Sequence, residues 1–485
     1  MKPQVETRPS ESYARPLCVD MDGTLLRTDT LHERMVVFLS THFRRAWLLP
    51  LWLGKGRAYF KRRLAEETDL SVDNLPCSES FLQFLLEQHR RGRRIILATA
   101  ADEKTAQQVA GRFRIFSEVI ATHGEQNLKG AHKLARLVQM FGGKGFDYAG
   151  NSWADLEIWR AANEAILVNA PRRLKAFVGK QAQVTHVFDD GIGWFARWRK
   201  VLRLHQWPKN LLLFVPVISG HKLDDLEIIG RVALGLVAFC LCASSAYIIN
   251  DVHDIEADRA HRTKRFRCFA AGQVPIGVCT IATPLLLAAS LACAVRLPIM
   301  FMIYLGAYFF TAIAYSWKLK RVALLDVFVL AGLYTLRILA GHGASGIGYS
   351  NWLLGFSIFL FLSLSLLKRY VELHRLDTAH GSNLAGRGYR AGDQLIVSTL
   401  GLACGCLSAL VLALYINSNE VRLLYARPWL LLFTCPLLLY WVSRAWLLAS
   451  RDQLHDDPVV FALKDSVSYV AGGLVVLFTW LATIQ

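Results

Sequence analysis

Long apolar segments in the second half of the chain constrain its fold more than any other sequence feature. A helix that crosses a bilayer needs about 20 mostly apolar residues. Residues 207–485 carry only 23 basic and 16 acidic side chains, and long runs have no charge at all. The sequence therefore predicts an all-α polytopic membrane domain over 208–485. Its nine expected transmembrane helices are 208–220 (short), 230–249, 276–295, 298–315, 322–341, 351–367, 395–416, 428–449 and 467–484.

The connections between these segments differ in charge. One alternating set holds 15 Lys and Arg residues and the other holds 4. Because basic connections stay in the cytoplasm, we expect a multi-pass protein of the inner (cytoplasmic) membrane, with the N-terminal region in the cytoplasm and the C-terminus outside. The juxtamembrane stretch 191–207 mixes Trp with Arg, which favours a helix at headgroup level over a charged linker.

An acidic motif occupies the first basic connection. Asp251, Asp254 and Asp258 have the spacing of one helical face, and Asn250 precedes them. Carboxylates that share a face repel one another unless they share a cation, and Mg²⁺ suits oxygen ligands that also bridge substrate phosphates. Lys264 and other cations follow in the sequence. The motif predicts a metal–diphosphate site, and the alternative is a solvated helical cap.

These segments and the sequence NDVHDIEADRAHRTKRFRCFAAG resemble the UbiA superfamily of intramembrane prenyltransferases. QWPKNLLLFVPVISG, YSWKLKRVALLDV and KRYVEL are similar to its decaprenyl-phosphate phosphoribosyltransferase branch. That likeness implies Mg²⁺-dependent transfer of 5-phosphoribose from phosphoribosyl diphosphate to a polyprenyl phosphate lipid. The substrate-binding residues that it implies are Lys209, Asn250, Lys264, Arg267, Lys318, Lys320, Lys368, Arg369 and Glu372.

The loop after the sixth segment bears on the choice of substrate. Aromatic prenyltransferases usually carry a second aspartate-rich motif there, whereas this chain has Lys368, Arg369 and Glu372. Several cations suit a terminal phosphate better than a second metal cluster. Two alternatives stay open: a 4-hydroxybenzoate-like polyprenyltransferase, or a loop that is basic only because it is cytoplasmic.

The N-terminal part has the pattern of a soluble α/β domain. An apolar strand ends in Asp20-x-Asp22-Gly-Thr, and further apolar strands are expected at 93–98, 117–120, 146–150 and 165–169, with helices between them. This alternation predicts a doubly wound parallel sheet. Ligands then bind at the carboxyl ends of the strands, where Asp20, Thr99 and Asp155 fall.

The Asp-x-Asp-Gly-Thr motif resembles that of the haloacid dehalogenase-like phosphohydrolases. The resemblance implies that Asp20 attacks phosphorus, that Asp22 protonates the leaving oxygen, and that Thr99 and Lys133 bind phosphate. The implied metal ligands are Asp20, Asp22, Asn151 and Asp155, and Asn151 stands where a carboxylate is common. The domain is therefore either an active phosphatase or a degenerate accessory domain.

The expected organisation is a haloacid dehalogenase-like (Rossmannoid) domain over 1–190, a linker helix over 191–207 and the membrane domain over 208–485. Residues 30–90 form a helical cap, whose WLLPLWLG stretch either touches the bilayer or packs on the core. If both domains are active, the phosphatase removes the 5-phosphate from the lipid made by the transferase. Polyprenyl phosphate and phosphoribosyl diphosphate are the expected partners, and no nucleic acid is expected.

Overall fold

A computed structural model describes residues 15–123, 128–191, 193–261, 263–375, 387–454, 458–462 and 464–484. The chain divides into two compact units. The first comprises the residues up to Leu202 together with Asp251–Ala282, and the second comprises Arg203–Asn250 and Thr283–Gln485. The division differs from the predicted domains in two respects. The connection that carries the acidic motif packs with the N-terminal residues, and the predicted linker 191–207 is divided between the units after Leu202.

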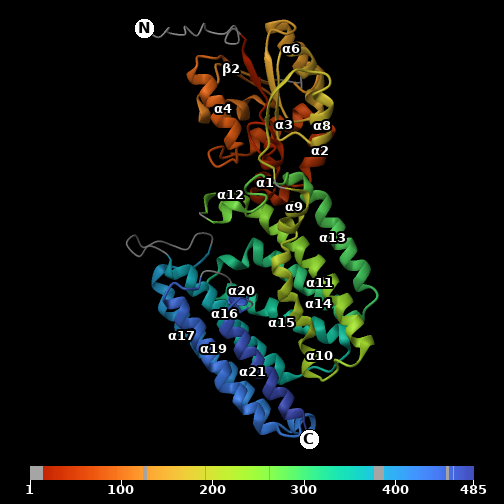
Figure 1. The fold of residues 1–485 in the computed structure, drawn as a ribbon, viewed down its shortest axis with the longest axis vertical. Coiled ribbons are helices and arrows are strands. Elements are labelled where there is room, and N and C mark those ends of the chain that lie inside the picture. The colour runs from red at the N-terminus through yellow and green to blue at the C-terminus, as the bar shows by residue number, and fades with distance from the viewer. Residues whose placement is uncertain are drawn as a thin grey trace, which may run out of the picture. The chain divides into compact units, whose positions relative to one another are not determined.

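The N-terminal unit is built on a six-stranded parallel sheet (Figure 1). The strands lie in the order β3-β2-β1-β4-β5-β6, which confirms the predicted doubly wound pattern and the five predicted strands. The sequence prediction lacked β6. The strands are β1 (Leu17–Val19), β2 (Ile95–Asp102), β3 (Glu118–Thr122), β4 (Asp147–Gly150), β5 (Ala165–Val168) and β6 (Val184–Phe188).

Side chains that alternate in direction along the strands form two buried clusters, one on each face of the sheet. Leu17 and Val19 belong to one buried cluster, whereas Cys18 between them belongs to another, because successive strand residues point to opposite faces. Helices cover both faces. They are α4 (Glu79–Arg90), α5 (Glu103–Phe113), α6 (Ala131–Phe141), η3 (Trp153–Asp155), α7 (Leu156–Ala161) and α8 (Arg172–Val178), and α9 (Trp194–Val201) follows the sheet.

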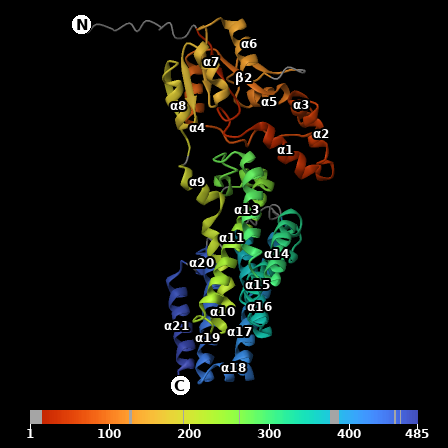
Figure 2. The ribbon, with the colours of Figure 1, turned by 90° about the vertical axis from the view of Figure 1, so that its right-hand side faces the viewer.

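A helical insert joins β1 to β2, as predicted. Figure 2 shows α1, α2 and α3 to one side of the sheet. The connection 251–282 adds three short helices to the same unit. The elements of the insert are α1 (Thr30–Thr41), η2 (Phe43–Arg45), α2 (Leu48–Gly54) and α3 (Arg57–Glu67), and those of the connection are α12 (Ile255–Ala260), η5 (Lys264–Phe266) and η6 (Ile276–Val278).

The second unit is helical. Among the described residues, eight helices of the chain are long and apolar enough to cross a membrane. The remaining predicted span, 208–220, consists of a 3₁₀ helix followed by a five-residue α-helix. That this segment also crosses the membrane stays a prediction. The helices are η4 (Leu204–Phe214), α10 (Val215–Ser219), α11 (Leu226–His253), α13 (Cys279–Ala294), α14 (Ile299–Trp317), η7 (Leu319–Arg321), α15 (Leu325–Ser345), α16 (Asn351–His374), η9 (Ala391–Asp393), α17 (Gln394–Ile416), α18 (Asn419–Leu424), η10 (Pro428–Phe433), α19 (Thr434–Ser450), α20 (Pro458–Ala462) and α21 (Ser466–Thr483).

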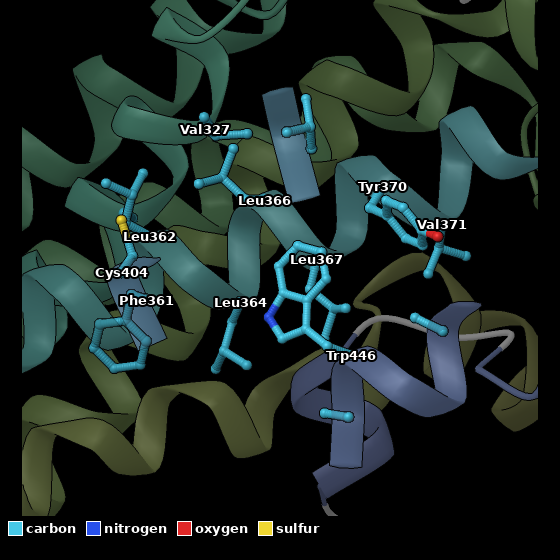
Figure 3. Close-up of a cluster of buried hydrophobic side chains, with 14 of the residues drawn as sticks. Val327, Phe361, Leu362, Leu364, Leu366, Leu367, Tyr370, Val371, Cys404 and Trp446 are labelled. Carbon is cyan, nitrogen blue, oxygen red and sulfur yellow. The ribbon is translucent and has the colours of Figure 1, made fainter. Parts of the chain in front are cut away.

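Close packing holds α16, α17 and α19 together. Trp446 of α19 lies among Leu364, Leu366 and Leu367 of α16 (Figure 3). A Cβ atom on Gly401 of α17 would lie 2.1 Å from the Trp446 ring, so only glycine permits this approach. Since lipid tails are as apolar as leucine, such close contact rather than burial from water favours helix association in a bilayer.

Candidate functional site

A cavity of about 560 Å³ lies at the carboxyl ends of β1, β2 and β4 in the N-terminal unit. The sequence places polar residues there because each of these strands ends at the same edge of the sheet. All six residues predicted for the soluble domain line this one cavity. They are Asp20, Asp22, Thr99, Lys133, Asn151 and Asp155.

Lys133 is a buried cation that lines the cavity. Its Nζ lies 2.7 Å from Asp20 Oδ1, 3.0 Å from the Tyr148 hydroxyl and 3.9 Å from Asp155 Oδ1. The Tyr148 hydroxyl in turn donates to Asp155 at 2.9 Å. Sequence reasoning missed Tyr148, which lies on strand β4 between Asp147 and Ala149 and gives no signal beyond its hydroxyl group. It also missed Lys61 of α3, which lines the same cavity and donates to the Ala100 carbonyl at 2.6 Å.

Burial raises the pKa values of the two aspartates of the first motif, Asp20 and Asp22, by different amounts. It raises the pKa of Asp20 to about 6, against the opposing effect of Lys133. It raises the pKa of Asp22 further, to about 7, with the Asp29 carboxylate adding to the effect. Burial alone would lower the pKa of Lys133, but Asp20 and Asp155 outweigh it and the pKa is raised. Near neutral pH the cavity therefore favours a largely ionised Asp20 and a charged Lys133, while Asp22 is still partly protonated.

Asp155 serves the local structure as well as the cavity. Its Oδ2 accepts from the Asn151 and Ser152 amides at 3.3 and 3.0 Å and from the Ser152 hydroxyl at 2.9 Å, while Oδ1 accepts from Tyr148. These bonds fix the turn after β4. The Asn151 side chain lies against Gly23, where a Cβ atom would come within 2.0 Å of the amide nitrogen.

The donor set bears on the predicted metal. The residues that the structure describes contain no group of three or more His, Cys, Asp or Glu side chains placed to hold one ion. Mg²⁺ commonly takes one or two carboxylates and completes its shell with water and substrate phosphate. Asp20 and Asp22, with the amide oxygen of Asn151, fit that need, and Asp155 supports them through its hydrogen bonds.

The acidic motif is bent rather than continuous. Helix α11 ends at His253, Asp254 caps α12, and Asp258 lies within α12. Asp251 and Asp258 are both buried, and Nη1 of Arg267 bridges them at 3.4 and 2.7 Å. Burial raises the pKa of Asp258. Arg267 was predicted to bind phosphate, and in the structure its guanidinium lies between the carboxylates of Asp251 and Asp258. Two carboxylates that approach the same cation are an arrangement that could equally hold Mg²⁺.

The connection that follows the acidic motif packs in the same unit as the cavity. Arg259 donates from Nη1 and Nη2 to the Glu33 carboxylate at 3.0 and 2.6 Å, and both side chains are buried. Thr28 also donates to Glu33. Pro275 lines the cavity itself. Residues assigned from the sequence to the membrane domain therefore support the soluble site.

In the second unit, Arg369 is fully buried between two carboxylates. It lies 2.8 Å from Asp326 of α15 and pairs with Glu372 one turn along α16. Arg387 lies 3.3 Å from each of these carboxylates, and the Tyr389 hydroxyl donates to Asp326 at 2.5 Å. The charges of Arg369 and Glu372 thus belong to a network that ties α15 to α16, and the substrate binding predicted for these two residues stays a prediction.

The other predicted basic residues of this unit lie near helix ends. Lys209 is buried in η4, with its ammonium 5.7 Å from the centre of the Tyr334 ring. Lys318 is the exposed C-cap of α14, and Lys320 lies in η7. Lys368 is half-buried on α16 beside Arg369. Asn250 lies one residue before Asp251 on α11.

Comparison with known proteins identifies the family of the chain. The model of the UbiA prenyltransferase family matches residues 213–467, more than half of the sequence. The chain belongs to this family. It is therefore a multi-pass membrane protein of a transferase family, as the apolar helices indicate.

Individual relatives add detail. Uncharacterized protein y4nM of Sinorhizobium fredii is 38% identical over 465 residues, covering 95% of this chain and 89% of the relative. Nodulation protein NoeC of Azorhizobium caulinodans is 33% identical over 57% of this chain and 90% of its own length. Decaprenyl-phosphate phosphoribosyltransferase of Mycolicibacterium smegmatis is 39% identical over 178 residues, covering 36% of this chain and 56% of that enzyme.

Proposed function

We propose that this family member transfers 5-phosphoribose from phosphoribosyl diphosphate to a polyprenyl (decaprenyl) phosphate, and that its N-terminal domain is a haloacid dehalogenase-like phosphatase that removes the 5-phosphate. The transferase part is supported by the similarity to the Mycolicibacterium smegmatis enzyme and by the two aspartates that converge at Arg267. The phosphatase part is supported by one observation above all, namely the cavity that collects Asp20, Asp22 and Lys133.

In the proposed transfer, a phosphate oxygen of the lipid attacks the anomeric carbon of the donor. The bond from that carbon to the diphosphate oxygen breaks, and diphosphate leaves. Asp251, Asp254 and Asp258 are the residues that would hold Mg²⁺, which when bound neutralises charge on the departing diphosphate. Lys264 and Lys368 are positively charged and would bind the phosphates of the donor.

In the proposed hydrolysis, an Asp20 oxygen attacks phosphorus and the bond from phosphorus to the ester oxygen breaks. Asp22 gives its proton to the leaving alkoxide, a role that its raised pKa of about 7 suits. Water then cleaves the aspartyl phosphate, releasing inorganic phosphate and restoring Asp20, while Asp22 takes the proton of the water. Lys133, 2.7 Å from Asp20, holds the attacking carboxylate in place. Asp20, Asp22 and Asn151 are the residues that would hold Mg²⁺ here, and the ion would screen the charge of the phosphate when bound.

A donor and acceptor assay tests the transfer. Purified protein in nanodiscs with Mg²⁺ receives either labelled phosphoribosyl diphosphate with decaprenyl phosphate, or polyprenyl diphosphate with 4-hydroxybenzoate. The proposal predicts a ribosylated lipid, identified by mass, from the first pair only. A prenylated aromatic acid without any ribosylated lipid would instead support the aromatic prenyltransferase alternative.

A further inference from the structure

An apolar surface covers the outer side of the helical insert. Phe43, Trp47, Leu51 and Leu53 are 60%, 64%, 55% and 52% exposed. The first three are each four residues apart, a spacing that places side chains along one side of a helical segment. Leu53 lies two residues after Leu51, roughly 200° around α2, and so points away from these three. We call Phe43, Trp47 and Leu51 the insert surface.

The insert surface is the outer side of a well-anchored segment. Trp52, on the opposite side of α2, is buried against Phe38, Phe60 and Leu64, and its ring centre lies 5.3 Å from that of Phe38. Partly buried Leu48 and Leu49 pack against the same cluster. The segment therefore has one apolar side that packs in the core and a second apolar side that is largely exposed among the residues that the structure describes. Contiguous exposed apolar patches of this kind usually mark an interaction site.

The charges around the insert surface favour one occupant. Residues 43–57 contain Arg44, Arg45, Lys55 and Arg57, all exposed, and no Asp or Glu. Arg45 pairs with Glu67 of α3 at 3.1 Å, so the segment carries an excess of positive charge from Arg44, Lys55 and Arg57. Large apolar side chains that include a tryptophan, set beside such an excess of cations, match the headgroup region of an anionic bilayer. A soluble protein partner would gain nothing comparable from these cations unless it were itself acidic.

The insert surface also adjoins the hydrolase cavity. Leu53 and Arg57, two and six residues after Leu51, line the cavity that contains Asp20. An ester phosphate carried by a lipid would thus pass from the bilayer surface along Leu53 and Arg57 to the nucleophile.

We propose that the insert surface rests on an anionic lipid bilayer, and that the hydrolase cavity takes its phosphate ester from a lipid in that bilayer. The first part stands on exposure, spacing and charge alone. The second part rests on the proposed phosphatase function and narrows its substrate to a membrane-borne phosphate ester.

Photo-crosslinking tests the contact. p-Benzoylphenylalanine is introduced in place of Trp47, or in place of Val187 as a control, in the full chain in nanodiscs of phosphatidylcholine and phosphatidylglycerol. Val187 of β6 is 52% exposed but lies beside Asp189 and Asp190. The proposal predicts a lipid adduct at position 47 and none at 187. A protein–protein adduct at 47, or equal lipid labelling at both positions, would overturn it.

Hydrolysis kinetics test the substrate class. Trp47→Glu combined with Leu51→Glu should reduce hydrolysis of polyprenyl-phosphoryl ribose 5-phosphate in nanodiscs about tenfold, since two apolar contacts with lipid are lost. Hydrolysis of ribose 5-phosphate should stay unchanged, and Val187→Glu should alter neither rate. An equal loss on both substrates would refute the lipid route. If the unmodified protein hydrolyses neither ester, the phosphatase proposal fails, while the crosslinking result still decides the membrane contact.

Discussion

Arg259→Met should lower the stability of the N-terminal unit, because it leaves the Glu33 carboxylate buried without its cation. Nη1 and Nη2 of Arg259 donate to Glu33 at 3.0 and 2.6 Å, Nε donates to the Ala270 carbonyl at 3.2 Å, and Glu33 is only 1% exposed. Breaking a buried pair by removing one partner typically costs about 3–5 kcal/mol. For a unit of roughly 230 residues, each kcal/mol shifts Tm by about 2–4 °C. We therefore expect a decrease of roughly 6–20 °C.

The assay is thermal unfolding of the full chain in detergent, followed by intrinsic fluorescence. Glu33→Gln combined with Arg259→Met should recover most of the loss, because the buried charge disappears together with its partner. Glu66→Gln is the matched control. Its pair with Arg63 also has a short distance, 2.7 Å, but is half exposed, so the variant should cost at most about 1 kcal/mol. If Arg259→Met shifts Tm no more than Glu66→Gln does, this buried pair does not support the fold.

Three further predictions follow from the sites. Asp251→Ala should abolish transfer while the protein stays folded, measured by lipid product and by thermal unfolding; near-normal turnover would contradict the metal assignment. Lys368→Ala should raise KM for phosphoribosyl diphosphate, whereas Arg369→Ala should chiefly lower stability, because it removes the fully buried cation from between Asp326 and Glu372 and leaves Arg387 as the cation of Asp326; the reverse pattern in kinetics and Tm would refute this division. Raised folded-state pKa values of Asp20 and Asp22 mean that the metal-free folded unit binds more protons than the unfolded chain between about pH 4 and 7. Its Tm should therefore fall as pH rises through that window, and Mg²⁺ should raise Tm more near pH 7 than near pH 5; an equal Mg²⁺ effect at both values would count against metal binding by these carboxylates.

The sequence predicted which residues line the cavity of the N-terminal unit, because most of those residues lie at or just after the carboxyl ends of strands. Asp20 and Thr99 belong to adjacent parallel strands, so locating the strands also locates the residues in space. Strand β6 escaped prediction because it lies at a sheet edge and none of its five residues is buried, so its sequence carries no apolar strand pattern.

Other features depend on contacts between distant residues, which a single sequence does not contain. The charge pattern of the connections predicts that Arg369 lies on the cytoplasmic side. It does not predict that Arg369 pairs with Asp326, which lies on the preceding helix. The pairing of Glu33 with Arg259 joins positions more than two hundred residues apart. The helical spacing of the acidic motif likewise gave no sign of the bend at Asp254, because spacing reports periodicity and not where a helix ends.

The most direct test of the proposed two-step function is the product made by Asp20→Asn. The variant removes the attacking carboxylate of the hydrolase, and no residue assigned to the transfer reaction is changed. With labelled phosphoribosyl diphosphate, decaprenyl phosphate and Mg²⁺, the unmodified protein should yield decaprenyl-phosphoryl ribose and inorganic phosphate. Asp20→Asn should instead accumulate decaprenyl-phosphoryl ribose 5-phosphate, with little leakage because loss of a nucleophile costs many orders of magnitude in rate. If the unmodified protein itself releases only the 5-phosphorylated lipid and Asp20→Asn is indistinguishable from it, the N-terminal domain is not the phosphatase of this reaction.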